Sequence, residues 1–412
     1  MRSNIIKRLV VISQCFYPEL FRINDICSEW VKRGYKVTVI TGIPNYPQGK
    51  YYDGYGLFKR RRETYNGIEI RRIPLIPRGH SGAMLAINYL SFVVSGFFWY
   101  LFTGLKADLV FIYEVSPMSQ ALPGVWYAKR RKTPCFLYVT DLWPESVEII
   151  AGVKNKLILG LIGKMVDYIY KRCDRIFASS MSFTKAIGGR GVPSGKIKFW
   201  PSYAEDFYIK LDGKSVSAPE IPRDGRFNVL FAGNIGFAQG LEILPQTAFL
   251  LKQRNAAIRF NIVGDGRFKA KLIRMIQDRQ IDDMFNLISI QPPERIPEFM
   301  AVCDAALICL SGNKAFSMTI PSKMQSCLAC GKPIIASCDG EVGRIVSEAN
   351  AGVVAEPGNP AMLADKICEM KDKSVKELAG LGLNGYEYYR AHFDKKMLMD
   401  EMDGEFLPAM KK

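Results

Sequence analysis

The sequence predicts an α/β protein with two Rossmann-like domains, each built around a parallel sheet. Three observations carry this prediction. The chain has 412 residues, which is too long for one ordinary hydrophobic core. Short apolar runs alternate with segments of helical periodicity, and the alternation starts again near residue 228. In the second half, glycines directly follow several of these runs, as happens where a strand turns into a helix.

Strands are expected at the apolar runs of each half. In the first half these runs are 9–13, 37–41, 109–113, 136–140 and 175–179, and in the second half 228–232, 259–263, 286–290, 305–310, 333–336 and 352–355. Residues 212–225 are rich in Ser, Pro, Gly and Asp, which favours a linker. We therefore expect a first domain over 1–205, a linker over 206–225 and a second domain over 226–385.

Composition narrows the classes of protein. Hydrophobic residues make up 48% of the chain, which argues against disorder. The ten cysteines lie mostly in apolar runs and form no CxxC pair, as expected for buried thiols in a reducing cytosol. Residues 1–8 are basic, but the apolar run after them is too short for a secretory signal. The chain is therefore expected to begin inside the cell.

The positive charge is confined to the first half. Residues 1–200 hold 30 Lys and Arg against 13 Asp and Glu, a net charge of +17, and residues 201–412 hold 26 against 27, a net charge of −1. Basic clusters at 59–62, 71–72 and 129–132 could face nucleic acid, an anionic leaflet or a polyanionic acceptor. For any single cluster, a solvated face is the favoured interpretation.

Residues 83–104 form a run of 22 residues without a charge. This length is enough to cross a bilayer, although Asn88, Ser91, Ser95 and Thr103 interrupt the run. If the run crossed the membrane, residues 1–80 would also be separated from the other strands of the same sheet. A helix buried in the first domain, or lying shallowly in the membrane interface, is therefore favoured over a span.

Three glycine-punctuated motifs predict a nucleotide site in the second half. Glycine after a strand lets the backbone approach a ligand, and the next helix offers N–H groups and a positive dipole end to phosphate. Pro321 and Ser322 favour a helix start with serine as the cap, which would aim Lys323 at the site. Glycines that serve packing and an ordinary surface lysine are the competing interpretation. The predicted donor-binding residues are Gly233, Asn234, Gly236, Gln239, Gly264, Asp265, Gly266, Ser322 and Lys323.

The order of the motifs gives a family resemblance over nearly the whole chain. The motifs lie at 16–19, 33–41, 44–47, 140–146, 232–242, 263–266 and 321–336. In this order the chain resembles the family-4 type retaining glycosyltransferases of the GT-B fold. It looks most like the bacterial O-antigen and capsule branch, which includes N-acetyl-L-fucosamine transferases. The resemblance implies two Rossmann-like domains facing a central cleft, and a C-terminal helix over 386–412 that returns to the first domain.

The resemblance also implies the substrates and the location. The donor would be a UDP-sugar, such as an N-acetylated deoxyhexosamine, and the acceptor a polyprenyl-diphosphate-linked sugar. The enzyme would lie in the cytoplasm, peripherally on the inner face of the cell membrane, with an anionic membrane surface and no nucleic acid as partner. Aromatic residues of the tail, Tyr386, Tyr388, Tyr389 and Phe393, would pack on the first domain.

The chain departs from the family pattern at the donor site. Met318 and Ser326 stand where two glutamates are common, and Asn234 and Gln239 stand where an arginine and a lysine often hold the diphosphate. The roles of the two glutamates therefore cannot be transferred by matching.

No Asp-x-Asp occurs in the sequence, so a metal-free site without a cofactor is expected. Lys323 and backbone N–H groups would meet the charge of the departing diphosphate. Asp141 and Glu145 follow a predicted strand, where open α/β sheets bind ligands. They could bind hydroxyls or assist deprotonation of the acceptor. Asp141 as a helix cap is an equally weighted alternative.

Other classes remain as alternatives. A nucleotide-sugar 2-epimerase would share the fold, but it has no obvious use for a basic, apolar first domain. A basic nucleic-acid-binding protein would explain the charge, but neither the apolar 83–104 run nor the glycines after strands. A glycogen-type phosphorylase would need a much longer chain. A dinucleotide dehydrogenase is excluded because residues 14–18 after the first strand are not GxGxxG.

Overall fold

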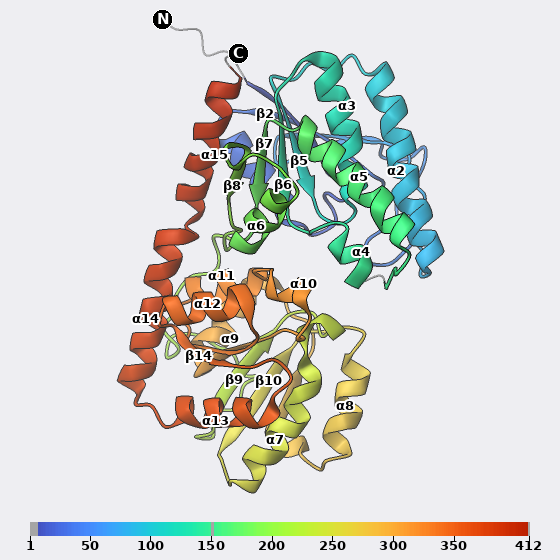
Figure 1. Ribbon diagram of the computed structural model, residues 1–412. Coiled ribbons are helices and arrows are strands. Elements are labelled where there is room, and N and C mark those ends of the chain that lie inside the picture. The colour runs from blue at the N-terminus through green and yellow to red at the C-terminus, as the bar shows by residue number, and fades with distance from the viewer. Residues whose placement is uncertain (1–6, 150–151, 411–412) are drawn as a thin grey trace, which may run out of the picture. The chain divides into compact units, whose positions relative to one another are not determined.

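The computed structural model describes residues 7–149 and 152–410. The chain divides into two compact units (Figure 1), one of Met1–Trp200 with Asp400–Lys412 and the other of Pro201–Met399. Each unit contains one sheet, eight-stranded in the first and six-stranded in the second, and helices connect its parallel strands. The predicted α/β fold class with two Rossmann-like domains is confirmed.

The first sheet has the strand order β3-β4-β2-β1-β5-β6-β7-β8. Its strands are β1 (Arg8–Ile12), β2 (Lys36–Thr41), β3 (Arg62–Tyr65), β4 (Ile68–Arg72), β5 (Leu109–Glu114), β6 (Cys135–Val139), β7 (Arg175–Ala178) and β8 (Ile197–Phe199). The helices of this unit are α1 (Arg22–Lys32), α2 (Gly82–Phe102), α3 (Leu122–Arg131), α4 (Glu145–Ile149), α5 (Lys156–Arg172) and α6 (Met181–Gly189), with the end of α15 (Lys395–Ala409).

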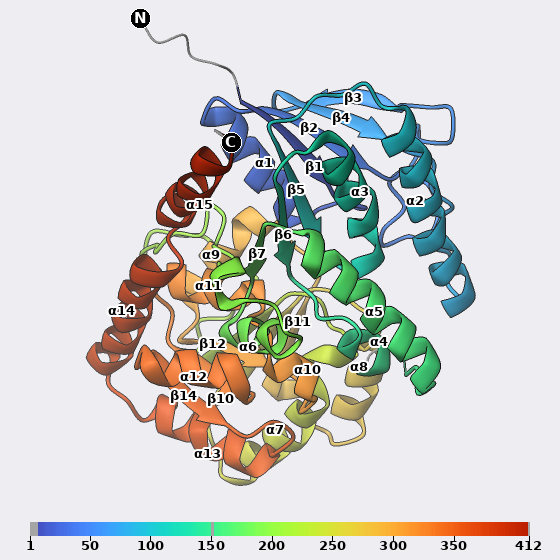
Figure 2. The same ribbon diagram turned by 45° about the horizontal axis from the view of Figure 1, so that its top comes forward.

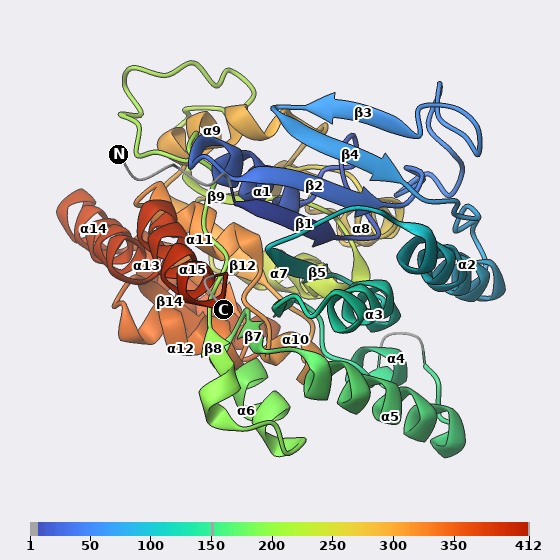
Figure 3. The same cartoon turned by 90° about the horizontal axis from the view of Figure 1, so that it is seen from above.

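Both faces of this sheet are covered, because strands such as β5 are buried at every position. On one face, Trp30 of α1 and Phe406 of α15 pack against Phe111 of β5, with ring centroids 4.9 Å and 6.0 Å from that of Phe111. On the other face, the Cα of Gly124 in α3 lies so close to Ile12 and Ile112 that a Cβ there would be 2.9 Å from both side chains. α2 and α5 flank α3 on that face (Figure 3).

The hairpin of β3 and β4 was not predicted. It pairs antiparallel at the edge of the sheet (Figure 2), and it contains arginines that the sequence assigned to basic surface clusters. Arg72 is buried and donates to Glu63, whereas Arg71 is paired with Glu69 at 2.7 Å. The interpretation of 71–72 as a solvated cluster is therefore wrong for Arg72.

α2 covers the charge-free run and is the one helix among the described residues that is long and apolar enough to cross a membrane. Ser81 caps its start by accepting from the N–H of Met84. Only Asn88, Phe92 and Gly96 are buried, at a spacing of four residues, so a single stripe of α2 faces the protein. Much of the remaining surface is apolar and exposed, at Ile87, Leu90, Val94, Phe97, Phe98 and Phe102.

The second sheet is all parallel, with the order β11-β10-β9-β12-β13-β14. Its strands are β9 (Phe227–Ala232), β10 (Ile258–Val263), β11 (Phe285–Ile288), β12 (Ala305–Cys309), β13 (Ile334–Ser337) and β14 (Gly352–Ala355). Its helices are α7 (Leu244–Gln253), α8 (Lys269–Gln277), α9 (Ile296–Val302), α10 (Lys314–Ser317), α11 (Ser322–Ala329), α12 (Gly340–Glu348), α13 (Pro360–Lys371) and α14 (Val375–His392). Apolar residues of α7, α8 and α13 form one core with this sheet.

The C-terminal segment divides between the units. α14, with Tyr386, Tyr388 and Tyr389, belongs to the second unit, as does Phe393, and the hydroxyl of Tyr388 lies 3.2 Å from the carboxylate of Glu348 in α12. These aromatic residues thus group with the second unit, whereas their packing on the first domain stays a prediction. Only residues 400–412 group with the first unit, where Phe406 fills the aromatic core.

Candidate functional site

At the carboxyl edge of the second sheet, the structure brings two of the glycine motifs together. The loop after β9 begins at Gly233, and the loop after β10 begins at Gly264. The N–H of Gly233 donates to the carbonyl of Val263 at 3.0 Å, and the N–H of Ile235 donates to the carbonyl of Asp265 at 2.8 Å. The two loops thus form one hydrogen-bonded surface beside the strand ends.

The glycines of these loops serve different purposes. Gly264 has a φ of +143°, and a Cβ there would lie 2.0 Å from the carbonyl oxygen of Gly233, so this glycine is required for contact between the loops. A Cβ on Gly233 would instead meet Nζ of Lys323 first, at 3.6 Å. Of these two, Gly233 is the one that faces a charged group.

Lys323 lies in the first turn of α11 and is half-buried. Its ammonium donates to Oε1 of Gln239 and lies 4.0 Å from the centroid of the Phe231 ring. Burial lowers its pKa to about 8, although the nearby thiols of Cys309 and Cys327 act in the opposite direction. The structure therefore brings three predicted residues together, Gly233, Gln239 and Lys323, around one partly desolvated cation.

Ser322 is not the helix cap that the sequence predicted. The cap position is Pro321, in extended conformation, and Ser322 is the first helical residue with an exposed side chain. Proline has no side-chain oxygen to accept from the helix, and no side-chain hydrogen bond caps this helix start. The N–H of Met324 donates to the carbonyl of Pro321 at 2.9 Å, so the N–H groups of Ser322 and Lys323 are the ones that could bind another acceptor, such as an anion.

The other predicted donor residues lie at the same edge. The amide of Asn234 fills the space between two glycines: its nitrogen would lie 2.8 Å from a Cβ on Gly236, and its oxygen 2.6 Å from a Cβ on Gly266. The carboxylate of the exposed Asp265 accepts from the N–H of Gly266 at 2.8 Å. Both side chains shape the loops, and Asp265 remains open to solvent.

The two positions without the family glutamates have no carboxylate. Met318 directly follows α10 as its C-cap, and Ser326 is buried within α11, where its hydroxyl donates to the carbonyl of Ser322 at 3.2 Å. The start of α12 abuts the end of α10, because a Cβ on Gly340 would lie 2.0 Å from the carbonyl oxygen of Ser317. The next residue, Glu341, is buried and accepts from Arg344 at 2.8 Å. Sequence reasoning did not select Glu341. The signal that could have found this carboxylate is its position directly after Gly340, a glycine that follows strand β13.

The predicted acids of the first unit lie at the carboxyl edge of its sheet. Asp141 accepts hydrogen bonds from the hydroxyls of Ser116 and Ser146, which join the loop after β5 to α4. These donors are hydroxyls rather than backbone N–H groups of a helix start, so the contacts differ from those of a helix cap. Glu145 begins α4, and its buried Oε2 has no hydrogen-bond partner among residues 7–149 and 152–410.

Sequence reasoning missed a neighbouring acid and a polar chain. Glu114, the last residue of β5, is fully buried, and its pKa is raised well above the ordinary value by burial and by the charge of Asp141. Nearby, the N–H of Gln14 donates to Gln120 at 2.6 Å, and the amide of Gln14 donates to Asn88 at 2.8 Å. These residues come from segments far apart in the sequence, after β1, on α2 and after β5, so no local pattern could show the group.

The carboxylate of Glu19 joins the motif at 16–19 to the motif at 44–47. Glu19 is buried and accepts from the N–H groups of Asn45 and Tyr46 at 2.8 Å and 2.7 Å. Burial raises its pKa although these hydrogen bonds oppose the shift. Glu19 therefore holds the 44–47 loop against the segment after β1.

Among residues 7–149 and 152–410, no group of three or more His, Cys, Asp or Glu side chains is arranged to hold a metal ion. Lys323 is one charged group that the structure offers to a phosphate at the second sheet, and Lys269 of α8, which donates to the carbonyl of Gly264 at 3.2 Å, is another at the same edge.

Two family models match the chain without overlap. The glycosyl transferase 4-like domain matches residues 21–202, and the glycosyl transferases group 1 domain matches residues 216–388. WcaI of Escherichia coli (strain K12), which is named as a glycosyl transferase of colanic acid biosynthesis, is 26% identical over 365 residues, or 82% of this chain and 85% of that protein. WbjE of Pseudomonas aeruginosa, named as a glycosyltransferase, is 28% identical over 253 residues, or 58% of this chain and 61% of that protein.

Solved structures share the fold at low identity. The sucrose-phosphate synthase of Thermosynechococcus elongatus has a TM-score of 0.75 at 15% identity and covers 98% of both chains. HepE of Anabaena in complex with UDP has a TM-score of 0.70 at 14% identity and covers 98% of this chain and all of that one. At this low identity, the similarity to solved structures shows the fold alone. The two family models show the class of enzyme. The chain therefore belongs to the glycosyltransferases of the GT-B fold, with a glycosyl transferase 4-like first domain and a group 1 second domain.

Proposed function

We propose that this glycosyltransferase moves a sugar from a UDP-sugar to a polyprenyl-diphosphate-linked acceptor in the synthesis of a bacterial surface polysaccharide, an O-antigen or capsule. The donor sugar proposed is an N-acetylated deoxyhexosamine such as N-acetyl-L-fucosamine. The observation that carries the proposal is the half-buried Lys323 beside Gly233, at the start of a helix without a side-chain cap. The similarity to WcaI supports the polysaccharide context, and the UDP in the HepE structure supports the nucleotide.

The chemistry follows from the charge of the leaving group. Breaking the bond between the sugar and UDP leaves negative charge on the diphosphate, so catalysis needs positive groups that are already in place. Lys323 would supply a full charge, and the first N–H groups of α11 would supply partial charges. This proposal needs no metal ion, and the sugar would keep its anomeric configuration.

On the acceptor side, Asp141 and Glu145 would orient a sugar hydroxyl. Asp141 is held by two serine hydroxyls, so its carboxylate has a fixed position. The buried Oε2 of Glu145, which has no hydrogen-bond partner among the residues that the structure describes, would gain a hydrogen bond from such a hydroxyl. The departing phosphate could then accept the proton of the acceptor.

A peripheral location on the cytoplasmic face of the membrane is part of the proposal. α2 and α5 both flank α3 in the first unit (Figures 1 and 3). Both helices have exposed apolar side chains, among them Phe98 and Phe102 on α2 and Leu157 and Leu161 on α5. Asn88 anchors α2 to the protein through hydrogen bonds with Gln14 and the carbonyl of Ile76. These contacts favour a helix that lies in the interface with its other faces in lipid.

Donor binding is tested by thermal unfolding of the purified protein with a panel of UDP-, GDP- and dTDP-sugars. A ligand that binds the folded state raises the melting temperature, so UDP-sugars should give the largest shift. Transfer is then measured with a polyprenyl-diphosphate-linked sugar in the presence of EDTA, and NMR of the product gives the anomeric configuration. Stabilisation by GDP-sugars alone, loss of transfer in EDTA, or conversion of the UDP-sugar without an acceptor would each contradict part of the proposal. The last outcome would favour an epimerase.

A further inference from the structure

A polar cavity lies in the first unit, at the amino ends of strands β1 and β2. It has a volume of about 370 Å³ and is lined by Arg8, Leu9, Lys36, Thr38, Glu69, Arg71, Gly104, Leu105 and Lys106. Asp141 and Glu114 lie at the opposite, carboxyl ends of strands in the same sheet. The cavity is therefore separate from the residues assigned to the acceptor.

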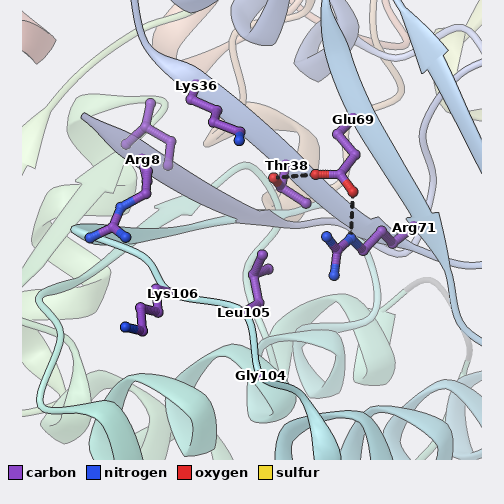
Figure 4. A pocket seen from close by; sticks show the side chains of 9 residues that line it. Arg8, Lys36, Thr38, Glu69, Arg71, Gly104, Leu105 and Lys106 are labelled. Carbon is purple, nitrogen blue, oxygen red and sulfur yellow. Dashed lines mark hydrogen bonds and ion pairs between the residues drawn. The ribbon is translucent and has the colours of Figure 1, made fainter. Parts of the chain in front are cut away.

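Four basic side chains from four different chain segments surround this cavity. Figure 4 shows Arg8 and Lys106 on one side of the space and Arg71 on the other. Arg8 and Lys36 are direct partners in the pairing of β1 with β2, and like charges at such positions repel each other. An anion between the strands would relieve this repulsion.

Two of the four cations are balanced by carboxylates. Arg8 binds Asp108 through both Nη2, at 2.6 Å, and Nε, at 3.1 Å, and its hydrogen bond lowers the pKa of Asp108. Arg71 donates to Glu69 at 2.7 Å. Burial acts to raise the pKa of Glu69, but the hydrogen bond and charge of Arg71 lower it overall. Two carboxylates thus oppose four cations, and an excess of positive charge remains with the exposed Lys36 and Lys106.

The nearby end of α2 does not cancel this charge. The carbonyls at a helix C-terminus carry partial negative charge, which would disfavour an anion. Here Arg130 donates to the carbonyl of Tyr100 at 2.9 Å, and Arg131 donates to the carbonyl of Thr103 at 2.6 Å. These arginines bind the free carbonyls at the end of α2 and so offset their partial negative charge. The cavity wall at 104–106, which follows α2, therefore keeps the positive charge of Lys106.

We propose that this cavity binds the phosphate group of an anionic ligand, with Lys36 and Lys106 as its charge-assisted donors. The volume lies at the lower end of the range for small-molecule sites, about 300–1,000 Å³, and suits an organic phosphate. The phosphate could belong to a phospholipid headgroup or to a free phosphate ester. The headgroup is favoured, because the cavity wall directly follows α2, which ends in the exposed side chains of Phe98 and Phe102. The inference does not depend on the donor site.

The test compares three variants of the full-length protein. Lys36→Ala/Lys106→Ala removes the two proposed donors. Lys50→Ala/Lys185→Ala removes two exposed lysines of the same unit that do not line the cavity, so it controls for the change in net charge. Lys323→Ala controls for phosphate binding at the donor site. Affinity for glycerol 3-phosphate is measured by calorimetry, and sedimentation measures binding to phosphatidylcholine vesicles with and without phosphatidic acid.

The cavity variant should bind glycerol 3-phosphate about tenfold more weakly, the loss expected for charge-assisted contacts, with both controls unchanged. An equal loss on phosphatidic acid vesicles assigns the phosphate to a lipid headgroup. Normal vesicle binding assigns it to a free ester. If the cavity variant matches the Lys50→Ala/Lys185→Ala control in both measurements, the inference is overturned. Because thermal shifts with UDP-sugars report on Lys323 separately, failure here leaves the proposed function standing.

Discussion

The ammonium of Lys323 lies 4.0 Å from the centroid of the Phe231 ring, where the ring face attracts a cation. Its other close neighbours are the amide oxygen of Gln239 and the open space at Gly233, where a Cβ would lie 3.6 Å from the ammonium. Neutral groups therefore hold a half-buried cation, and a carboxylate at that position would compete with an incoming anion. A diphosphate would complete the charge pairing that this site lacks.

Replacing Lys323 with Ala should abolish transfer. The variant removes the charge proposed to stabilise the leaving diphosphate, and loss of one such preorganised donor costs about 10²–10³-fold in kcat. Turnover and the thermal shift with UDP-sugars are the measurements. Lys376→Ala, on an exposed position of α14, is the matched control and should behave as the wild type. Near-normal turnover of Lys323→Ala with an intact fold would refute the assignment.

UDP binding should weaken as the pH rises through about 8, the pKa to which burial lowers Lys323 in the free protein. Below that pH the amine is charged and can pair with the diphosphate. Above it the amine is neutral, so the association constant should fall by up to about tenfold per pH unit. Calorimetry with UDP between pH 6.5 and 9.5 measures this dependence. The slope should be absent in Lys323→Arg, because arginine keeps its charge in this range; a slope retained there would point to another group.

The sequence predicted the second sheet closely and the first less well, for physical reasons. Strands such as β9 and β10 are mostly apolar, are buried at nearly every position and end directly before a glycine, so their limits agreed with the structure to within one residue. The β3 and β4 hairpin was missed because an edge strand such as β3 has no buried position to reveal a face. The fold class depends on the buried parallel strands, and those were found.

The candidate site was predictable only where its residues lie close to glycines. Lys323 and Gly233 could be selected because each sits beside a strand end or a helix start. Glu114 could not, since its importance depends on contacts with residues far away in sequence. The predicted cap at Ser322 was displaced by one residue, because Pro321 already takes the cap position.

Asp141→Asn should separate the two interpretations of this residue. The amide keeps one acceptor for the hydroxyls of Ser116 and Ser146 but removes the negative charge, so the melting temperature should change little. If the charge orients or activates the acceptor, turnover should fall by about 10²-fold while UDP affinity stays the same. Ser146→Ala is the control, because it breaks a hydrogen bond to Asp141 and keeps the charge. Unchanged turnover of Asp141→Asn would favour a purely structural role.

Gly264→Ala should damage both stability and donor binding. The new Cβ would lie 2.0 Å from the carbonyl oxygen of Gly233, and backbone cannot move aside as a flexible side chain can. Separating the loops would shift Gly233 away from Lys323, and the strain should cost at least about 2 kcal/mol. Urea unfolding and the UDP-induced thermal shift measure the two effects.

Gly380→Ala provides the comparison for that variant. Gly380 lies within α14, and a Cβ there would meet no atom within 4 Å. Alanine is the better helix former, so this variant should be as stable as the wild type or more stable by up to about 1 kcal/mol. Both substitutions add the same methyl group, so the contrast reports the contact and the positive φ of Gly264, neither of which Gly380 has. If Gly264→Ala also left unfolding and UDP binding unchanged, the loop after β10 would not support the site around Lys323.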